Sequence, residues 1–137
     1  MSKRETVEGI VVAWLNDTLA DYKASTNTPK GLPVRYCLVR RTGGGRQDIV
    51  GDAAEIRIEV FDKNSQVDCA EIANYIADHI ELALPAEYED VTAVKVNSII
   101  SLDDKEKQYY RYQLFVDIFH SRVGSDEEPT PTPVPSA

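Results

Sequence analysis

Hydrophobic and polar positions recur with two different periods along this chain. Apolar residues three or four positions apart predict two amphipathic helices, over residues 6–21 and 66–84. Segments that alternate or are rich in β-branched and aromatic residues predict four strands, over 34–41, 54–61, 91–102 and 109–121. The chain therefore reads as helix, strand, strand, helix, strand, strand.

Prolines, glycines and polar residues mark the connections between these elements. Segment 23–33 has two prolines and is expected to be a loop, and the glycine-rich segment 42–52 is expected to be a flexible loop between two strands. Thr6 is the expected N-cap of the first helix. For the second helix, Ser65 and Asp68 resemble a capping box and Pro85 is expected to stop the helix.

The order of elements predicts an α+β domain of αββαββ type. We expect a four-stranded, mainly antiparallel sheet with both helices packed on one face, which leaves the other face uncovered. The domain is expected to span residues 1–123. The Pro-rich C-terminal tail, 124–137, is expected to be flexible, and either disordered or bound to a partner. For the first strand, the pattern leaves open whether Val34, Tyr36 and Leu38, or Cys37 and Val39, face the core.

Composition narrows the classes of function. The 137 residues include 23 acidic and 15 basic side chains, for a net charge of −8, which argues against a dedicated nucleic-acid-binding protein. No segment reaches the length of a membrane span, and we expect no signal peptide and no membrane association. Cys37 and Cys69 are not spaced as a CxxC pair, so we expect two reduced thiols.

Motifs that carry chemistry are not found in this sequence. The glycines after Thr42 lead toward a strand and lack the Lys-Ser/Thr of a phosphate-binding loop. His79 and His120 have no metal-ligand spacing with a carboxylate or cysteine. Glu55 and Glu59 share a strand face about 13 Å apart, too far for a glycosidase pair. We expect no catalytic, metal or cofactor site, and not an enzyme.

Two groups of residues are candidates for subunit or partner contacts. On the uncovered sheet face, an apolar patch rimmed by charges is typical of a protein interface. Its members are Glu55, Arg57, Glu59, Phe61, Arg111, Phe115 and Phe119. The second group is a charged loop region that could pair with acids of a neighbour, formed by Arg40, Arg41, Arg46, Asp48 and Asp52.

The arrangement resembles the tail-terminator, or tail-completion, proteins of long-tailed bacteriophages. The features that carry the resemblance cover roughly residues 6–122. They are the helix with Trp14-Leu15, the strand into Val39–Gly44, the strand Ala54–Val60, the alanine-rich helix Ala70–Ala83 and the strand Arg111–Asp117. The Pro-rich tail lies outside the family pattern.

The resemblance implies a structural virion protein at the head-tail junction, assembled in the host cytoplasm. Such a protein forms a ring, expected to be a hexamer, on the head-proximal end of the tail tube. The ring stops tube polymerisation and presents the surface for head joining, with the tail tube protein and a head-completion or neck protein as partners. DNA passes through its lumen without specific binding.

Other functions remain open at this point. The same small α+β domain would suit a head-completion stopper or another neck protein. A reading from a different class is a small dimeric ligand-binding domain that uses the open sheet face as a pocket floor. A further one is an enzyme whose active site forms only in an oligomer.

Overall fold

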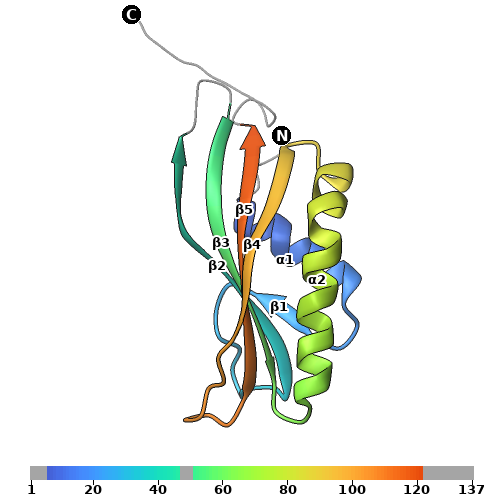
Figure 1. Cartoon of the computed structure of the whole chain (residues 1–137), viewed down its shortest axis with the longest axis vertical. Coiled ribbons are helices and arrows are strands. Elements are labelled where there is room, and N and C mark those ends of the chain that lie inside the picture. The colour runs from blue at the N-terminus through green and yellow to red at the C-terminus, as the bar shows by residue number, and fades with distance from the viewer. Residues whose placement is uncertain (1–5, 47–50, 122–137) are drawn as a thin grey trace, which may run out of the picture.

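Helices and strands follow one another in residues 6–46 and 51–121, the parts of the chain that the computed structural model describes (Figure 1). In chain order they are α1 (Val7–Thr18), β1 (Lys23–Ser25), β2 (Arg35–Arg46), β3 (Gly51–Asp62), α2 (Gln66–Glu87), β4 (Val91–Ser101) and β5 (Tyr110–Ser121). This confirms an α+β protein with two helices. The tail expected at 124–137 lies outside the described residues.

The strands form one mixed sheet in the order β1-β2-β3-β5-β4. The four long strands pair antiparallel, as expected, but β1 adds a fifth strand parallel to β2. The expectation of a loop over 23–33 is therefore wrong for Lys23–Ser25. The side chain of Asn16 in α1 holds this strand, because its Oδ1 accepts from Ala24 N at 2.8 Å and its Nδ2 donates to Ala24 O at 3.2 Å.

The β2–β3 hairpin extends further into the glycine-rich segment than the sequence predicted. Residues 42–46 belong to β2 and residues 51–52 to β3, so the expected loop over 42–52 is wrong at both ends; its centre, 47–50, lies outside the described residues. Backbone pairing with β3 overrides the low strand propensity of glycine here. The register shifts between Arg41 and Gly43, where β2 has a bulge.

The ends of α1 follow from its capping interactions. Thr6 is the N-cap, as expected, and its side chain accepts from Gly9 N at 3.0 Å. The helix ends at Thr18 and not at residue 21, because the backbone becomes extended at Leu19.

Helix α2 keeps only half of the expected capping box and runs past its proline. The Ser65 hydroxyl accepts from Asp68 N at 3.0 Å, but the Asp68 carboxylate binds Arg35 instead of returning to Ser65. Pro85 does not stop the helix, since the next turn closes when Tyr88 N donates to Leu84 O at 2.9 Å. Because proline has no N–H, the hydrogen bond from position 85 to Glu81 O is lost, and α2 continues for only two residues beyond Pro85.

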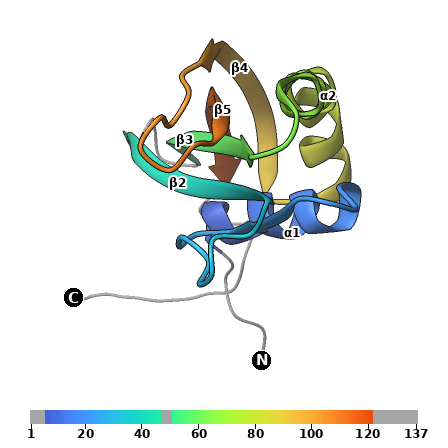
Figure 2. The same cartoon turned by 90° about the horizontal axis from the view of Figure 1, so that it is seen from below.

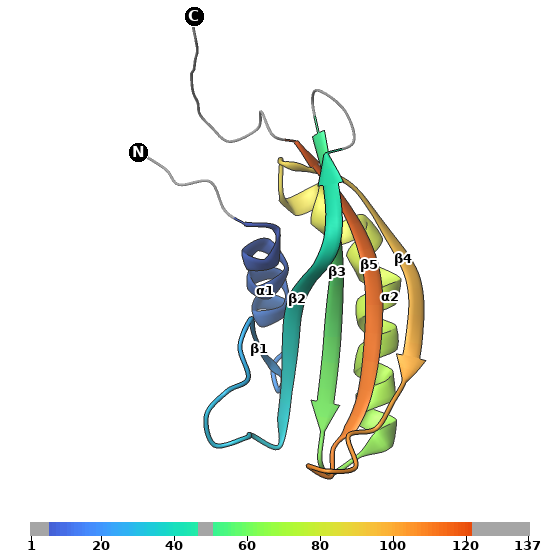
Figure 3. The ribbon, with the colours of Figure 1, turned by 90° about the vertical axis from the view of Figure 1, so that its left-hand side faces the viewer.

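Both helices pack on the same face of the twisted sheet, as expected (Figures 2 and 3). Cys37 and Val39 join this main core, which settles the orientation of the first strand. Tyr36 and Leu38 point to the opposite face, where they form a second, smaller apolar cluster. We call that opposite face the outer face.

Candidate interaction surfaces

The outer face brings together the sheet residues that the sequence singled out. Across β3 and β5, Arg57 pairs with Phe115, Glu59 with Gln113, and Phe61 with Arg111. Glu55 lies opposite Asp117 and Ala53 opposite Phe119 on the same face. Phe115 and Phe119 are partly exposed. The period-two alternation of both strands therefore places these charged and aromatic residues on one surface.

Phe61 differs from the other two phenylalanines because its ring is buried. Its ring stacks on Tyr36 with centroids 4.5 Å apart, and Tyr109 meets it edge-on at 5.5 Å. Tyr109 precedes β5 and is held in place by a hydrogen bond of 2.5 Å from its hydroxyl to Pro33 O. Phe61, with 4% of its surface exposed, is thus already covered within the subunit.

Glu59 is also buried, at 5% exposure, although it belongs to the sheet face that was expected to be uncovered. Its Oε2 accepts from Gln113 Nε2 at 2.7 Å and lies 3.6 Å from Arg111 Nη1. Burial of a carboxylate is costly unless the group is paired and hydrogen-bonded. Glu59 therefore anchors the outer face internally instead of offering a free charge.

Two arginines of the outer face are less well satisfied. Arg40 of β2 is exposed and lies directly opposite Arg57 of β3. Within the described residues the buried Nε of Arg57 has no hydrogen-bond partner, and it lies 3.9 Å from Glu59 Oε1. Like charges opposite each other on a sheet are destabilising. An acidic group from a partner would relieve this pair.

The second predicted group is only partly described. The backbones of Arg46 and Asp52 pair across the β2–β3 hairpin, whereas Asp48 lies outside the described residues. Arg41 is exposed, and its Nε donates to Gly43 O at 3.2 Å. Arg40 and Arg41, as neighbours on a strand, point to opposite faces, so they do not form one cluster with a common direction.

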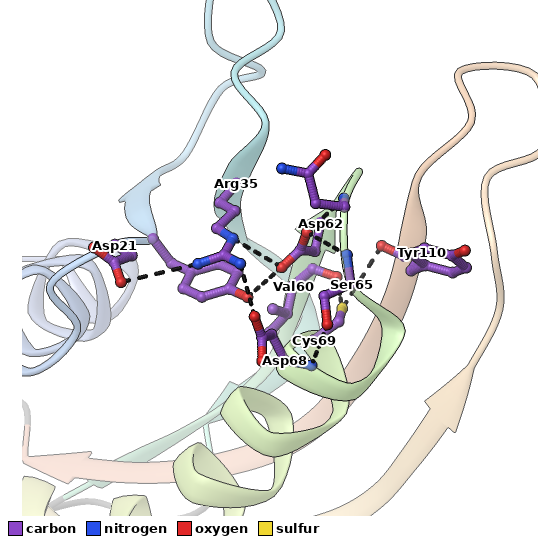
Figure 4. A network of polar contacts seen from close by, with 10 residues as sticks. Asp21, Arg35, Val60, Asp62, Ser65, Asp68, Cys69 and Tyr110 are labelled. Atoms are coloured by element: carbon purple, nitrogen blue, oxygen red, sulfur yellow. Dashed lines mark hydrogen bonds and ion pairs between the residues drawn. The ribbon is translucent and has the colours of Figure 1, made fainter.

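A buried polar network, which the sequence analysis missed, surrounds Asp62 at the end of β3 (Figure 4). The carboxylate is fully buried. Its Oδ2 accepts from the Tyr22 hydroxyl at 2.5 Å and from Arg35 Nε at 3.0 Å, and its Oδ1 accepts from Asn64 N and Ser65 N. Burial and this hydrogen bond raise the pKa of Tyr22. The network joins β3, β2, the segment after α1 and the start of α2.

The two cysteines are free, buried thiols. Cys69 Sγ donates to Val60 O at 3.3 Å. Burial raises the pKa of Cys69 to about 12 and also raises that of Cys37. Because the thiolate is the reactive form, neither side chain has the character of a nucleophile.

Other chemical groups on the described residues form no centre. His79 is exposed, stacks on Tyr75 and has its Nδ1 2.8 Å from Tyr75 O. Among the described residues, no three His, Cys, Asp or Glu side chains gather as metal ligands, and no helix is long and apolar enough to cross a membrane. A pocket of about 700 Å³ lies between the end of α1, β1 and the loop before β2, with Lys23 and Arg35 in its wall.

Comparisons with known proteins add no family assignment. No protein-family model matches the chain, and the curated proteins show no significant sequence similarity to it. The fold and its surfaces define a small α+β protein with one helix-covered and one open sheet face.

Proposed function

We propose that this chain is a structural protein of a long-tailed bacteriophage. In this proposal it forms a ring, expected to be a hexamer, that caps the head-proximal end of the tail tube. The ring stops polymerisation of the tube protein and offers the joining surface for the head. The order of helices and strands is compatible with the proposal, which starts from the resemblance of the sequence to tail terminators.

The outer face is the observation that favours an assembly role most. Phe115 and Phe119 are partly exposed there, next to Arg57 and its unsatisfied Nε. Aromatic residues and arginine are enriched in protein interfaces. A subunit of a ring needs two different contact patches, because each copy meets its neighbours head to tail. The outer face is suited to a partner or neighbour that carries apolar and acidic groups.

The charge of the chain supports a passive channel. With a net charge of −8, a ring of several copies repels DNA at close range, so DNA would move through its lumen without adhering. Replacing lumen-facing acids with lysine should then slow DNA passage, and unchanged infectivity would count against this part of the proposal.

Electron microscopy of a lysate tests the proposal. The phage would lack the gene for this chain, and a parallel lysate would carry the gene back on a plasmid. We expect filled heads next to unattached tails of abnormal and variable length, all restored by the plasmid. Free tails of normal length with heads that have lost their DNA would indicate a head-completion stopper instead. Intact infectious particles would overturn the proposal and favour the ligand-binding alternative.

A further inference from the structure

The two edges of the sheet differ in what they leave unpaired. At one edge of the sheet, β4 pairs with β5 and has no second strand neighbour among the described residues. At the other edge, β1 pairs only with residues 36–38 of β2, so in the described part of the chain β2 has no strand neighbour on that side from Val39 to Arg46. Free strand edges are templates for pairing with another chain unless something blocks them.

The edge at β4 is protected only in part. Exposed Lys95 and two register shifts, between Val91 and Ala93 and between Val96 and Ser98, are features that commonly protect an edge, but proline is missing from Val91–Ser101. Ile99 and Ile100 are 37% and 45% exposed, and Leu102 just beyond the strand is 50% exposed. One of its backbone donors is covered by a side chain, since Val96 N donates to Glu81 Oε2 at 2.8 Å. Glu81 itself is exposed on α2.

Strand direction allows the two edges to meet. β2, β3, β5 and β4 are successively antiparallel, so β4 runs opposite to β2. A second copy placed beside the first in the same orientation would bring its β2 next to β4 of the first copy as an antiparallel pair. That contact joins two different patches, and copies added in this way continue one sheet from subunit to subunit.

The register aligns two opposite charges across this contact. One cross-strand row consists of Arg41, Ile56, Val116 and Val96. Arg41 therefore ends the row at one edge of the sheet, and Glu81, bound to Val96, ends it at the other. When two copies pair without an offset along the strands, Glu81 of one copy lies beside Arg41 of the next. The free part of β2 then meets β4 only as far as Ile99, because β1 of the next copy occupies the edge opposite Ile100 and Ser101.

Charge also decides against the two symmetric alternatives. Glu81 and Glu89, both exposed, and Asp90 flank β4 and outnumber Lys95, the exposed cation of that strand, whereas exposed Arg40 and Arg41 belong to β2. Pairing β4 with a second β4 would bring the acids together, and pairing two β2 edges would oppose the arginines. Like charges at an interface disfavour that arrangement. The head-to-tail contact is the one in which the charges are complementary.

We infer that β4 of one copy pairs antiparallel with β2 of the next copy. Glu81 exchanges the Val96 N–H for Arg41 of the neighbour, and the freed N–H donates to the neighbour's backbone. This inference names the subunit contact of the ring and so rests on the proposed function, but it makes its own prediction for the purified protein. Each copy uses both edges, which is the requirement for a closed ring.

Charge exchange between Arg41 and Glu81 tests the contact in the purified full chain. Arg41→Glu and Glu81→Arg each place like charges in every contact, and we expect each to lower the association constant about tenfold or more. An equimolar mixture of the two variants should assemble again with alternating copies, and so should the double variant. Sedimentation velocity measures the assembly state, and circular dichroism verifies that each variant is folded.

Matched controls separate this contact from general charge effects. Glu71, another exposed acid of α2, and Lys105, in the β4–β5 turn, do not belong to the row that joins Arg41 to Glu81. Glu71→Arg and Lys105→Glu should leave association unchanged. If the single variants associate like the unchanged protein, or if their mixture stays dissociated, edge pairing is wrong while the ring proposal still depends on the electron microscopy. A wild-type chain that remains monomeric also overturns edge pairing.

Discussion

Tyr22 and Asp62, 40 residues apart in sequence, are joined by a hydrogen bond of 2.5 Å in which the tyrosine hydroxyl donates to a fully buried carboxylate. Arg35 donates to the same oxygen at 3.0 Å and, through its Nη2, to Asp68 at 2.7 Å. The guanidinium lies 5.5 Å from the centre of the Tyr22 ring. Asp62 is thus the common acceptor for segments that are distant in the chain.

Replacing Asp62 with asparagine should lower the free energy of unfolding by about 2–3 kcal/mol, because Arg35 and Tyr22 would lose a charged acceptor inside the fold. Urea denaturation measures the loss. Asp21 provides a control, since its side chain is 74% exposed and 3.9 Å from Arg35. Asp21→Asn should cost less than about 0.5 kcal/mol. Equal losses for the two variants would show that Asp62 is not the centre of the network.

Much of the fold was predictable because the long strands have a clear period. The strand expected at 109–121 is β5 at Tyr110–Ser121, and its alternation puts Leu114, Val116 and Ile118 on one face, which joins the main core. β1 was not predictable from pattern. It is three residues long and depends on a distant contact with the Asn16 side chain. A local window of sequence does not contain that contact.

The sequence predicted which residues share the outer face, but it did not predict how exposed their side chains are. Period two places Phe61, Phe115 and Phe119 on one face, yet Phe61 is buried because Tyr109 folds over it from the β4–β5 connection. That depends on the conformation of a turn. Asp62 did leave a signal in the sequence, since it is an acid at a core-facing position at the end of a strand. Such a residue must have buried partners.

The thiols should resist labelling in the folded protein. Burial raises the pKa of Cys69 to about 12 and raises that of Cys37, so both remain protonated and inaccessible at pH 8. We expect neither to react with Ellman's reagent until guanidinium unfolds the chain, after which both react. The single variants Cys37→Ala and Cys69→Ala assign any slow reaction to one residue. Rapid labelling of the folded protein would contradict the buried positions.

Stability should fall in alkaline solution. Burial raises the pKa of Tyr36 to about 12 from an ordinary value of 10.0, and the buried thiols start from 9.0. Above about pH 9 the unfolded chain releases protons that the folded chain keeps. The free energy of unfolding is therefore at its full value below that pH and decreases as the pH rises toward 12. Urea denaturation between pH 8 and pH 11 measures the slope.

Replacing Tyr36 measures how much this side chain contributes to the decrease of the unfolding free energy with pH. Tyr36→Phe removes the titrating hydroxyl and keeps the ring that stacks on Phe61, so it should make the decrease with pH shallower. Stability that rises between pH 9 and pH 11, or a slope that is the same in this variant, would show that Tyr36 does not contribute in this way.

Phe115 is a partly exposed aromatic residue whose replacement should separate head-to-tail joining from folding. It lies opposite Arg57 in the middle of the outer face, and its side chain is mostly buried within the subunit. Phe115→Ser should lower the free energy of unfolding by about 2 kcal/mol, because the subunit loses part of the apolar surface that the ring buries. The joining of heads to tails should fall much more, since aromatic residues at the centre of an interface carry a large share of its binding energy.

The matched control is Leu82, an apolar residue that is 79% exposed on α2. Leu82→Ser removes an apolar side chain that is more exposed than Phe115, from the helix-covered side of the sheet. In the phage that lacks the gene, a plasmid with Leu82→Ser should restore joined particles, whereas one with Phe115→Ser should not. Both variants should show cooperative thermal unfolding. If Phe115→Ser restores infectivity fully, the outer face is not the joining surface, because an aromatic anchor at its centre would then be dispensable.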